Sequence, residues 1–171
     1  LPWMSNWQYA NQVPTMQFRS ANSVPRDLGL FTDGGETYVS VVPSKELLAL
    51  RGAKVNKPTA ACELLIDIKS QAKPTVITLS NDKNEQVVMT YNPKERTFSM
   101  DRAQSGNTAF SDMFKATTVA PTHGTINQLR VFIDKCSIEA FDAAGKMAMT
   151  NLVFPTNPYD KLTIKGAART T

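Results

Sequence analysis

The sequence predicts an all-β protein built as an antiparallel two-sheet β-sandwich of the jelly-roll-like kind. Apolar residues recur with a period of two along much of the chain, as Leu64, Ile66 and Ile68 do. The alternating stretches are short, and polar turns rich in Gly, Pro, Asn and Asp separate them. Many short strands joined by tight turns are typical of a sandwich, in which each sheet buries one face against the other.

The first half of the chain should contribute five strands and one short helix. The strands are expected at residues 36–42, 62–69, 75–80, 86–91 and 96–101. Polar turns at 81–84 and 92–95 would make the last three an antiparallel meander. Residues 44–51 have helical spacing, with Ser44 as a plausible N-cap and Gly52 as the stop.

The second half should add four strands, at residues 129–134, 137–142, 147–154 and 161–165. The stretch from 103 to 128 between the two groups is expected to be a loop. Within it Phe110, Met113 and Phe114 are spaced by three and four, which suggests a short amphipathic turn. We expect these residues to plug one end of the core, while a ligand-facing aromatic is the alternative.

Composition excludes several classes of protein. The 171 residues are 42% apolar and 20% charged, which is a globular composition. The net charge of +4 comes from scattered basic residues, so we expect no nucleic-acid partner. No apolar run is long enough to span a bilayer, so no membrane span is expected. The aromatic-rich start of the sequence has no signal-peptide pattern, and we interpret it as a cut edge inside a larger protein.

Metal, cofactor and triad chemistry have little support in the sequence. His123 is the single histidine, in a loop by composition, and no cysteine pair at ligand spacing accompanies it. No G-x-S-x-G elbow is present for a serine nucleophile. We therefore expect no metal site and no cofactor. Cys62 and Cys136 could form a disulfide or remain buried free thiols, and the sequence leaves both open.

Two ordered sets of motifs resemble family 32 glycoside hydrolases. The first is W-M-S-N-W-Q-Y at residues 3–9, then V-P-T at 13–15, F-R at 18–19 and P-R-D-L at 25–28. It resembles the last strands of that family's five-bladed propeller, except that Phe18 stands where tryptophan is common. The second is D-R-A-Q-S-G at 101–106 and F-I-D-K-C-S-I-E-A-F at 132–141. It looks like the family's C-terminal sandwich, with Cys136 where serine is usual.

The resemblance implies a division of the chain and an absent catalytic half. Residues 1–30 would be a remnant of the catalytic propeller, and residues 31–171 the C-terminal β-sandwich. The family's nucleophile motif W-M-N-D-P-N-G, its R-D-P motif and its E-C motif are missing, although retaining glycosidases need two carboxyl groups. Neither Asp27 nor Glu63 sits in a matching motif. We expect no catalytic residue in this chain. The carboxylates Asp134, Glu139 and Asp142 are close in sequence, but we do not expect them to be catalytic. The alternative role for Glu139 is to anchor a turn or the interface with the propeller.

The resemblance also suggests a substrate-binding contribution. Trp7, with Asn6 beside it, is similar to a family position near the fructose pocket, and tryptophan suits stacking on sugar C–H faces. The alternative is that Trp3, Trp7 and Tyr9 only fill the gap between propeller blades.

Three functions follow from these expectations. The chain could be the inactive C-terminal part of a β-fructosidase that acts on levan, inulin or sucrose. It could be a lectin-like fructan-binding module, although Phe98, Phe132, Phe141 and Phe154 should alternate inward and leave only Tyr38, Tyr91 and Tyr159 freer. It could be a structural domain that packs on the propeller, with homo-oligomers left open and an exposed apolar patch expected on one face of the sandwich. Polymeric fructan substrates would imply an extracellular, cell-surface or periplasmic location.

Overall fold

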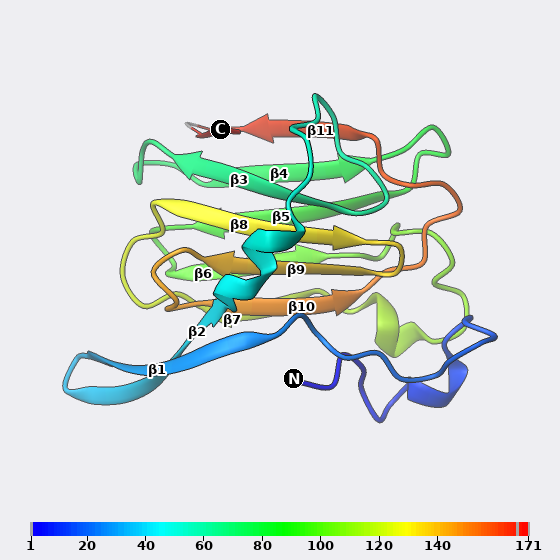
Figure 1. Cartoon of the computed structure of the whole chain (residues 1–171), viewed down its shortest axis with the longest axis horizontal. Coiled ribbons are helices and arrows are strands. Elements are labelled where there is room, and N and C mark those ends of the chain that lie inside the picture. Colours follow the sequence, from blue (N-terminus) through cyan, green and yellow to red (C-terminus); the bar gives the residue numbers. More distant parts are fainter. Residues whose placement is uncertain (1, 167, 171) are drawn as a thin grey trace.

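The strands of the chain form two five-stranded antiparallel sheets packed face to face (Figure 1). The computed structural model describes residues 2–166 and 168–170. One sheet has the order β10 (Ala148–Leu152), β9 (Ser137–Asp142), β8 (Gln128–Asp134), β3 (Cys62–Ile68), β12 (Ala168–Thr170). The other has the order β11 (Lys161–Lys165), β4 (Thr75–Ser80), β5 (Gln86–Asn92), β6 (Thr97–Asp101), β7 (Thr118–Pro121). The predicted two-sheet sandwich is confirmed.

The main core lies between the two sheets and explains the period-two pattern. Ile66 of β3, Ile77 of β4 and Met89 of β5 are completely buried, while the residues next to each of them in its strand are partly exposed. Successive side chains of a strand point to opposite faces, so alternate residues enter the core. The alternation in the sequence therefore reports one buried face of each sheet.

Two short strands escaped the sequence prediction. Strand β7 lies at an edge of its sheet, has four residues and ends in Pro121. Strand β12 has three residues and lies at the edge of the other sheet. Both are too short to establish a period, and proline is typical of edge strands. The pairing partners β6 and β3 create these strands, not local propensity.

A separate two-stranded ribbon, formed by β1 (Arg26–Asp33) and β2 (Glu36–Pro43), extends beyond the sandwich (Figure 1). Gly34 and Gly35 both have positive φ, as a type I′ hairpin turn requires. One ribbon face stacks Phe31 on Tyr38, with His123 of the sandwich beside both rings. Strand β2 was predicted, while β1 was not.

The expected helix at 44–51 is a 3-10 helix, η2 (Lys45–Leu50). Ser44 occupies the N-cap position, but its side chain makes no capping bond. Its hydroxyl bonds instead to the carboxylates of Asp27, at 3.0 Å, and Glu46, at 2.5 Å. The chain leaves this helix through Arg51 in extended conformation, before Gly52. Two further 3-10 helices are η1 (Ala10–Gln12) and η3 (Asp112–Lys115).

Residues 2–25, called here the N-terminal segment, contain η1 and one isolated bridge between Trp3 and Asn22. The expected boundary at residues 30 and 31 falls within β1, which is continuous from Arg26 to Asp33. The assignment of residues 1–30 to a propeller stays a prediction, and Leu1 lies outside the described residues. Within the described part of the chain, no helix has the length and apolar character needed to cross a membrane.

Candidate functional site

The first anchor between the N-terminal segment and the sandwich is Glu139 in the middle of β9. Its side chain is almost completely buried and pairs with the Arg26 guanidinium at 2.8 Å. It also accepts hydrogen bonds from the Val24 backbone N–H at 2.8 Å and from the Thr150 hydroxyl at 3.0 Å. A buried carboxylate needs such partners to offset its desolvation. Glu139 therefore connects Val24, near the end of the N-terminal segment, and Arg26, at the start of β1, to the sandwich.

This contact corrects the expected direction of two aromatic side chains. Phe132 and Phe141 pair across β8 and β9 with Glu139 and Arg130, so they lie on the outer face of the sheet. They were expected to alternate inward. Phe141 is nevertheless completely buried, because Arg26 lies over its ring at 5.0 Å. All six residues of β9 are buried because the chain before β1 and the ribbon cover its outer face.

The second anchor is Arg102 in the D-R-A-Q-S-G motif, directly after β6. Only 3% of this residue is exposed. Its Nη1 donates to the Leu152 carbonyl and its Nη2 to the Tyr9 hydroxyl, both at 3.0 Å. Its guanidinium also stacks over the Phe114 ring at 4.0 Å. A planar cation on an aromatic face is a favourable contact, which strengthens on desolvation. Arg102 thus joins three parts of the chain that lie far apart in sequence.

A small second core surrounds Arg102 and contains side chains from both the N-terminal segment and the sandwich. Its buried members are Met4, Tyr9, Val13, Phe114 and Leu152, with Phe110 and Phe154 packed against them. Phe110 and Phe114 were expected to plug one end of the core, but they pack in this separate cluster with the N-terminal segment. Met113, the third residue of that pattern, is about half exposed.

The end of the same motif closes a tight turn against the chain after β10. The Ser105 carbonyl accepts a hydrogen bond from the Tyr159 hydroxyl at 2.6 Å. Gly106 has φ of +126° and lies against the backbone of Phe154. Tyr159 is buried, and burial raises the pKa of its hydroxyl. Tyr91 is also buried, so the expectation that these two tyrosines are freer than the phenylalanines was wrong.

The contact region between the N-terminal segment and the sandwich is called here the junction. The predicted sugar-contacting residues lie at its surface. Trp7 is 88% exposed, and its ring leans on Trp3 with 4.9 Å between the centroids. Asn6 accepts a hydrogen bond from the Gln8 backbone N–H at 2.8 Å. A cavity of about 270 Å³ is lined by Trp3, Asn6, Tyr9, Arg102 and Asn151 among others, but not by Trp7. The structure therefore brings Asn6 beside the sandwich and leaves Trp7 facing outward.

The other carboxylates considered in the sequence have local partners. Glu63 pairs with Arg51 at 2.5 Å and with Arg130 at 2.7 Å. Asp142 accepts backbone hydrogen bonds within the β9–β10 turn, yet burial raises its pKa. Among the described residues, no group of three His, Cys, Asp or Glu side chains could hold a metal. Cys62 and Cys136 are free thiols and form no disulfide with each other, which decides between the two states that the sequence left open.

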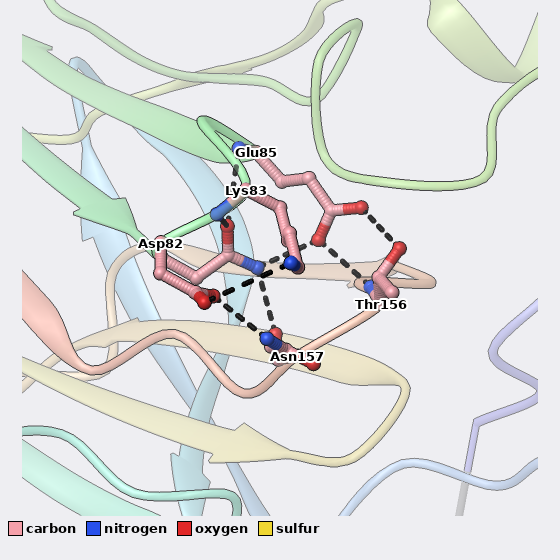
Figure 2. Close-up of polar contacts among 6 residues, drawn as sticks. Asp82, Lys83, Glu85, Thr156 and Asn157 are labelled. Atoms are coloured by element: carbon pink, nitrogen blue, oxygen red, sulfur yellow. Dashed lines mark hydrogen bonds and ion pairs between the residues drawn. The ribbon is translucent and has the colours of Figure 1, made fainter.

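A polar network holds the β4–β5 turn against the chain before β11 (Figure 2). Glu85 accepts bonds from the Thr156 backbone N–H and hydroxyl, at 2.7 and 2.6 Å. Asn81 donates to Glu85 and to the Asn157 carbonyl, at 2.6 and 2.8 Å. Asp82 accepts a further bond from the Asn157 amide at 2.7 Å. These contacts join the turn to residues more than 70 positions further along the chain, so we assign them a structural role.

The network should make the stability of the chain depend on acid pH through Glu85. Burial by itself would raise the pKa of Glu85, but hydrogen bonds from Thr156 and Asn81 outweigh it and hold the pKa below 4.5. A lowered carboxylate pKa stabilises the fold above the unfolded-state pKa, and this contribution disappears as the pH falls through the folded-state pKa. Glu85→Gln should therefore flatten the loss of melting temperature as the pH falls below about 5.

The matched control is Glu95→Gln, because Glu95 is exposed in the next turn of the same sheet. Melting curves by circular dichroism would measure both variants beside the parent chain. An acid limb that Glu85→Gln leaves as steep as before would contradict this role of the network.

Comparison with known proteins gives a consistent family. A family model described as "Glycosyl hydrolases family 32 C terminal" matches residues 30–170. The levanase of Bacillus subtilis is 32% identical over 180 residues, which cover 91% of this chain and 26% of the levanase. An extracellular exo-inulinase of Aspergillus niger is 29% identical and aligns over 91% of this chain and 33% of that protein.

Solved structures agree with the sequence matches. The crystal structure of exo-inulinase from Aspergillus awamori superposes with a TM-score of 0.81 at 25% identity, over 98% of this chain and 37% of that one. A fructofuranosidase from Schwanniomyces occidentalis complexed with fructose superposes with a TM-score of 0.68 at 18% identity, over 98% of this chain and 42% of that one. This second likeness shows the fold alone. The chain spans between about a quarter and two fifths of the length of these relatives.

Proposed function

This chain belongs to the glycosyl hydrolase family 32 C-terminal family, and from this premise we propose that it is the C-terminal part of a fructan- or sucrose-hydrolysing β-fructosidase. Residues 1–30 would end the catalytic propeller and residues 31–171 would form its supporting sandwich. The levanase and exo-inulinase names of the relatives support the substrate class. The parent enzyme would be a retaining glycosidase, and this chain by itself inactive, because the family's carboxylate motifs are missing from its sequence.

The observation that carries the supporting role is the pair of buried anchors. Glu139 and Arg102 both belong to the sandwich motifs, and both bind the stretch that resembles the propeller's last strands. A sandwich that only followed the propeller as an independent domain would not need buried charged contacts with it. The anchors therefore favour a sandwich that fixes the edge of the catalytic domain.

Trp7 and Asn6 would form one wall of the sugar pocket. Trp7 offers an exposed indole that is already supported on one side by Trp3, and such a face suits stacking on sugar C–H groups. Asn6 lies next to it with an amide that can bond hydroxyl groups.

A lectin-like binding module has weaker support, because the sandwich offers few exposed aromatic rings. Tyr91 and Tyr159 are buried, and Tyr38 leans on His123 at 4.2 Å between centroids. The apolar patch was expected on one sandwich face, whereas the exposed apolar residues Leu28, Leu30 and Val39 lie on the separate ribbon. These exposed residues suit packing within a larger enzyme, with self-association as the other outcome. An extracellular, cell-surface or periplasmic location would follow from polymeric substrates.

A domain exchange tests the proposal. This chain should replace the matching C-terminal region of the Bacillus subtilis levanase, and the chimera should hydrolyse levan while the isolated chain shows no turnover. Trp7→Ala in the chimera should raise KM roughly tenfold, because a stacking contact contributes about 1 kcal/mol or more. A chimera that melts cooperatively but does not hydrolyse levan, sucrose or inulin would contradict the proposal, as would turnover by the isolated chain.

A further inference from the structure

The contacts of Arg102 suggest more than support of the fold. We propose that Arg102 and Tyr9 form a positioning bridge, through which the sandwich fixes the Asn6–Trp7 turn and thereby the affinity of the sugar pocket. The spatial part of this inference depends only on the contacts in this chain. The part that concerns sugar affinity rests on the proposed function.

The turn from Asn6 to Tyr9 is short and internally bonded. The Asn6 carbonyl accepts hydrogen bonds from the backbone N–H groups of Tyr9, at 3.1 Å, and Ala10, at 2.8 Å. Tyr9 follows Trp7 by two residues and is 7% exposed, whereas Trp7 is 88% exposed. A fixed Tyr9 ring therefore determines where the exposed indole and the Asn6 amide are presented.

The Tyr9 ring is held on two sides by the sandwich. Its hydroxyl accepts from Arg102 Nη2 at 3.0 Å, and its ring meets the edge of Phe114 with 5.3 Å between centroids. The Tyr9 ring also meets Phe110 at 6.4 Å between centroids, while the exposed Trp7 ring packs on Trp3. Arg102 thus orients the Tyr9 side chain through a hydrogen bond, while Phe114 packs against its ring.

The other end of Arg102 is rigid. Its carbonyl accepts from the Ser105 backbone N–H at 3.0 Å, and its Nη1 donates to the carbonyl of Leu152 at the end of β10. No carboxylate faces the guanidinium among its contacts in the described residues, which are two neutral oxygens and the rings of Tyr9 and Phe114. A buried cation without a counter-ion contributes little to folding stability, since an apolar side chain could fill the same space without the cost of desolvating a charge. Its planar fork is a good device for fixing two oxygens in one geometry.

Two tyrosine-to-phenylalanine changes separate positioning from stability. Tyr9→Phe removes only the oxygen that Arg102 binds and keeps the ring in its seat. Tyr91→Phe removes a buried hydroxyl that donates to Gln71 Oε1 at 2.7 Å and accepts from the Ile126 backbone N–H at 3.1 Å, two residues that make no contact with Arg102 or Tyr9 among the bonds of the described residues. Both variants keep the ring and lose hydrogen bonds of a buried hydroxyl, so both should lower stability. Arg102→Met is a second variant that removes the bridge from the other side.

Trp3 and Trp7 are the only tryptophans of the chain, so their two indole N–H signals in a ¹⁵N spectrum report on this turn alone. Tyr9→Phe and Arg102→Met should shift or broaden both signals, and Tyr91→Phe should leave them in place. In the levanase chimera, Tyr9→Phe should raise KM roughly five- to tenfold with kcat nearly unchanged, as loss of one charge-assisted hydrogen bond predicts.

Unmoved indole signals in both bridge variants would overturn the inference. It would also be overturned if the signals moved but KM stayed at the parent value in a chimera whose Trp7→Ala variant raises KM. If the unmodified chimera is folded and inactive, the proposed function fails instead, and the indole signals still decide whether the bridge positions the turn.

Discussion

Replacing Gly106 with alanine is expected to lower the free energy of unfolding by about 4 kcal/mol or to prevent folding. An added Cβ would lie 2.2 Å from the Phe154 carbonyl oxygen and 2.6 Å from the Cα of Pro155, so it meets backbone that cannot rotate away. The glycine also has φ of +126°, which alanine rarely adopts. Relief of the clash would separate the turn from the chain after β10 and disturb the bond between the Asn107 N–H and the Phe154 carbonyl.

Gly124 provides the control for conformation without collision. It has φ of +90°, but nothing lies within 4 Å of an added Cβ. Gly124→Ala should therefore lower stability by about 1 to 2 kcal/mol, the cost of the backbone conformation by itself. Urea unfolding followed by circular dichroism would compare the two. Equal losses in the two variants would show that the contact with Phe154 has no special weight.

The second large effect is expected for Glu139→Gln, which should lower the free energy of unfolding by about 3 kcal/mol. The substitution keeps the shape of the side chain but removes the charge that faces Arg26, whose side chain is 11% exposed. A buried guanidinium without its carboxylate keeps its desolvation cost and loses its partner. The Val24 N–H and the Thr150 hydroxyl would also compete for a single remaining oxygen.

Two comparisons identify the source of this loss. Asp134→Asn changes an exposed carboxylate of the neighbouring hairpin turn and should stay within about 0.5 kcal/mol of the parent. The double variant Arg26→Met with Glu139→Leu should recover part of the stability, because it removes both charges and leaves apolar groups over Phe141. If the double variant is less stable than Glu139→Gln, the loss does not come from an unpaired charge. Limited proteolysis after Arg19 or Arg26 would show whether the N-terminal segment is released.

The sequence predicted the strands in which buried and exposed residues alternate. Strands β4, β5 and β6 follow from runs such as Thr75 to Ser80, in which every second residue is buried. The polar turns between them have the residues that tight reversals need, and Asn84 adopts φ of +58° in one of them. This information lies within a few residues of each position, so no tertiary structure is needed to obtain it. The family motifs at residues 101–106 and 132–141 were likewise recognisable from the sequence, because they follow one another in the order seen in the family.

Only the tertiary structure showed what those motifs do. Glu139 and Arg26 are 113 residues apart, and Arg102 and Tyr9 are 93 residues apart, so no local pattern links them. Alternation placed Phe141 on the wrong face because β9 is covered on both sides, and a period of two cannot tell which face meets the core when neither meets water. The sequence by itself thus determined the two-sheet sandwich, whose strands follow local alternation. The junction with the N-terminal segment was decided by contacts between distant residues, because buried charges are stable only where the fold brings their partners.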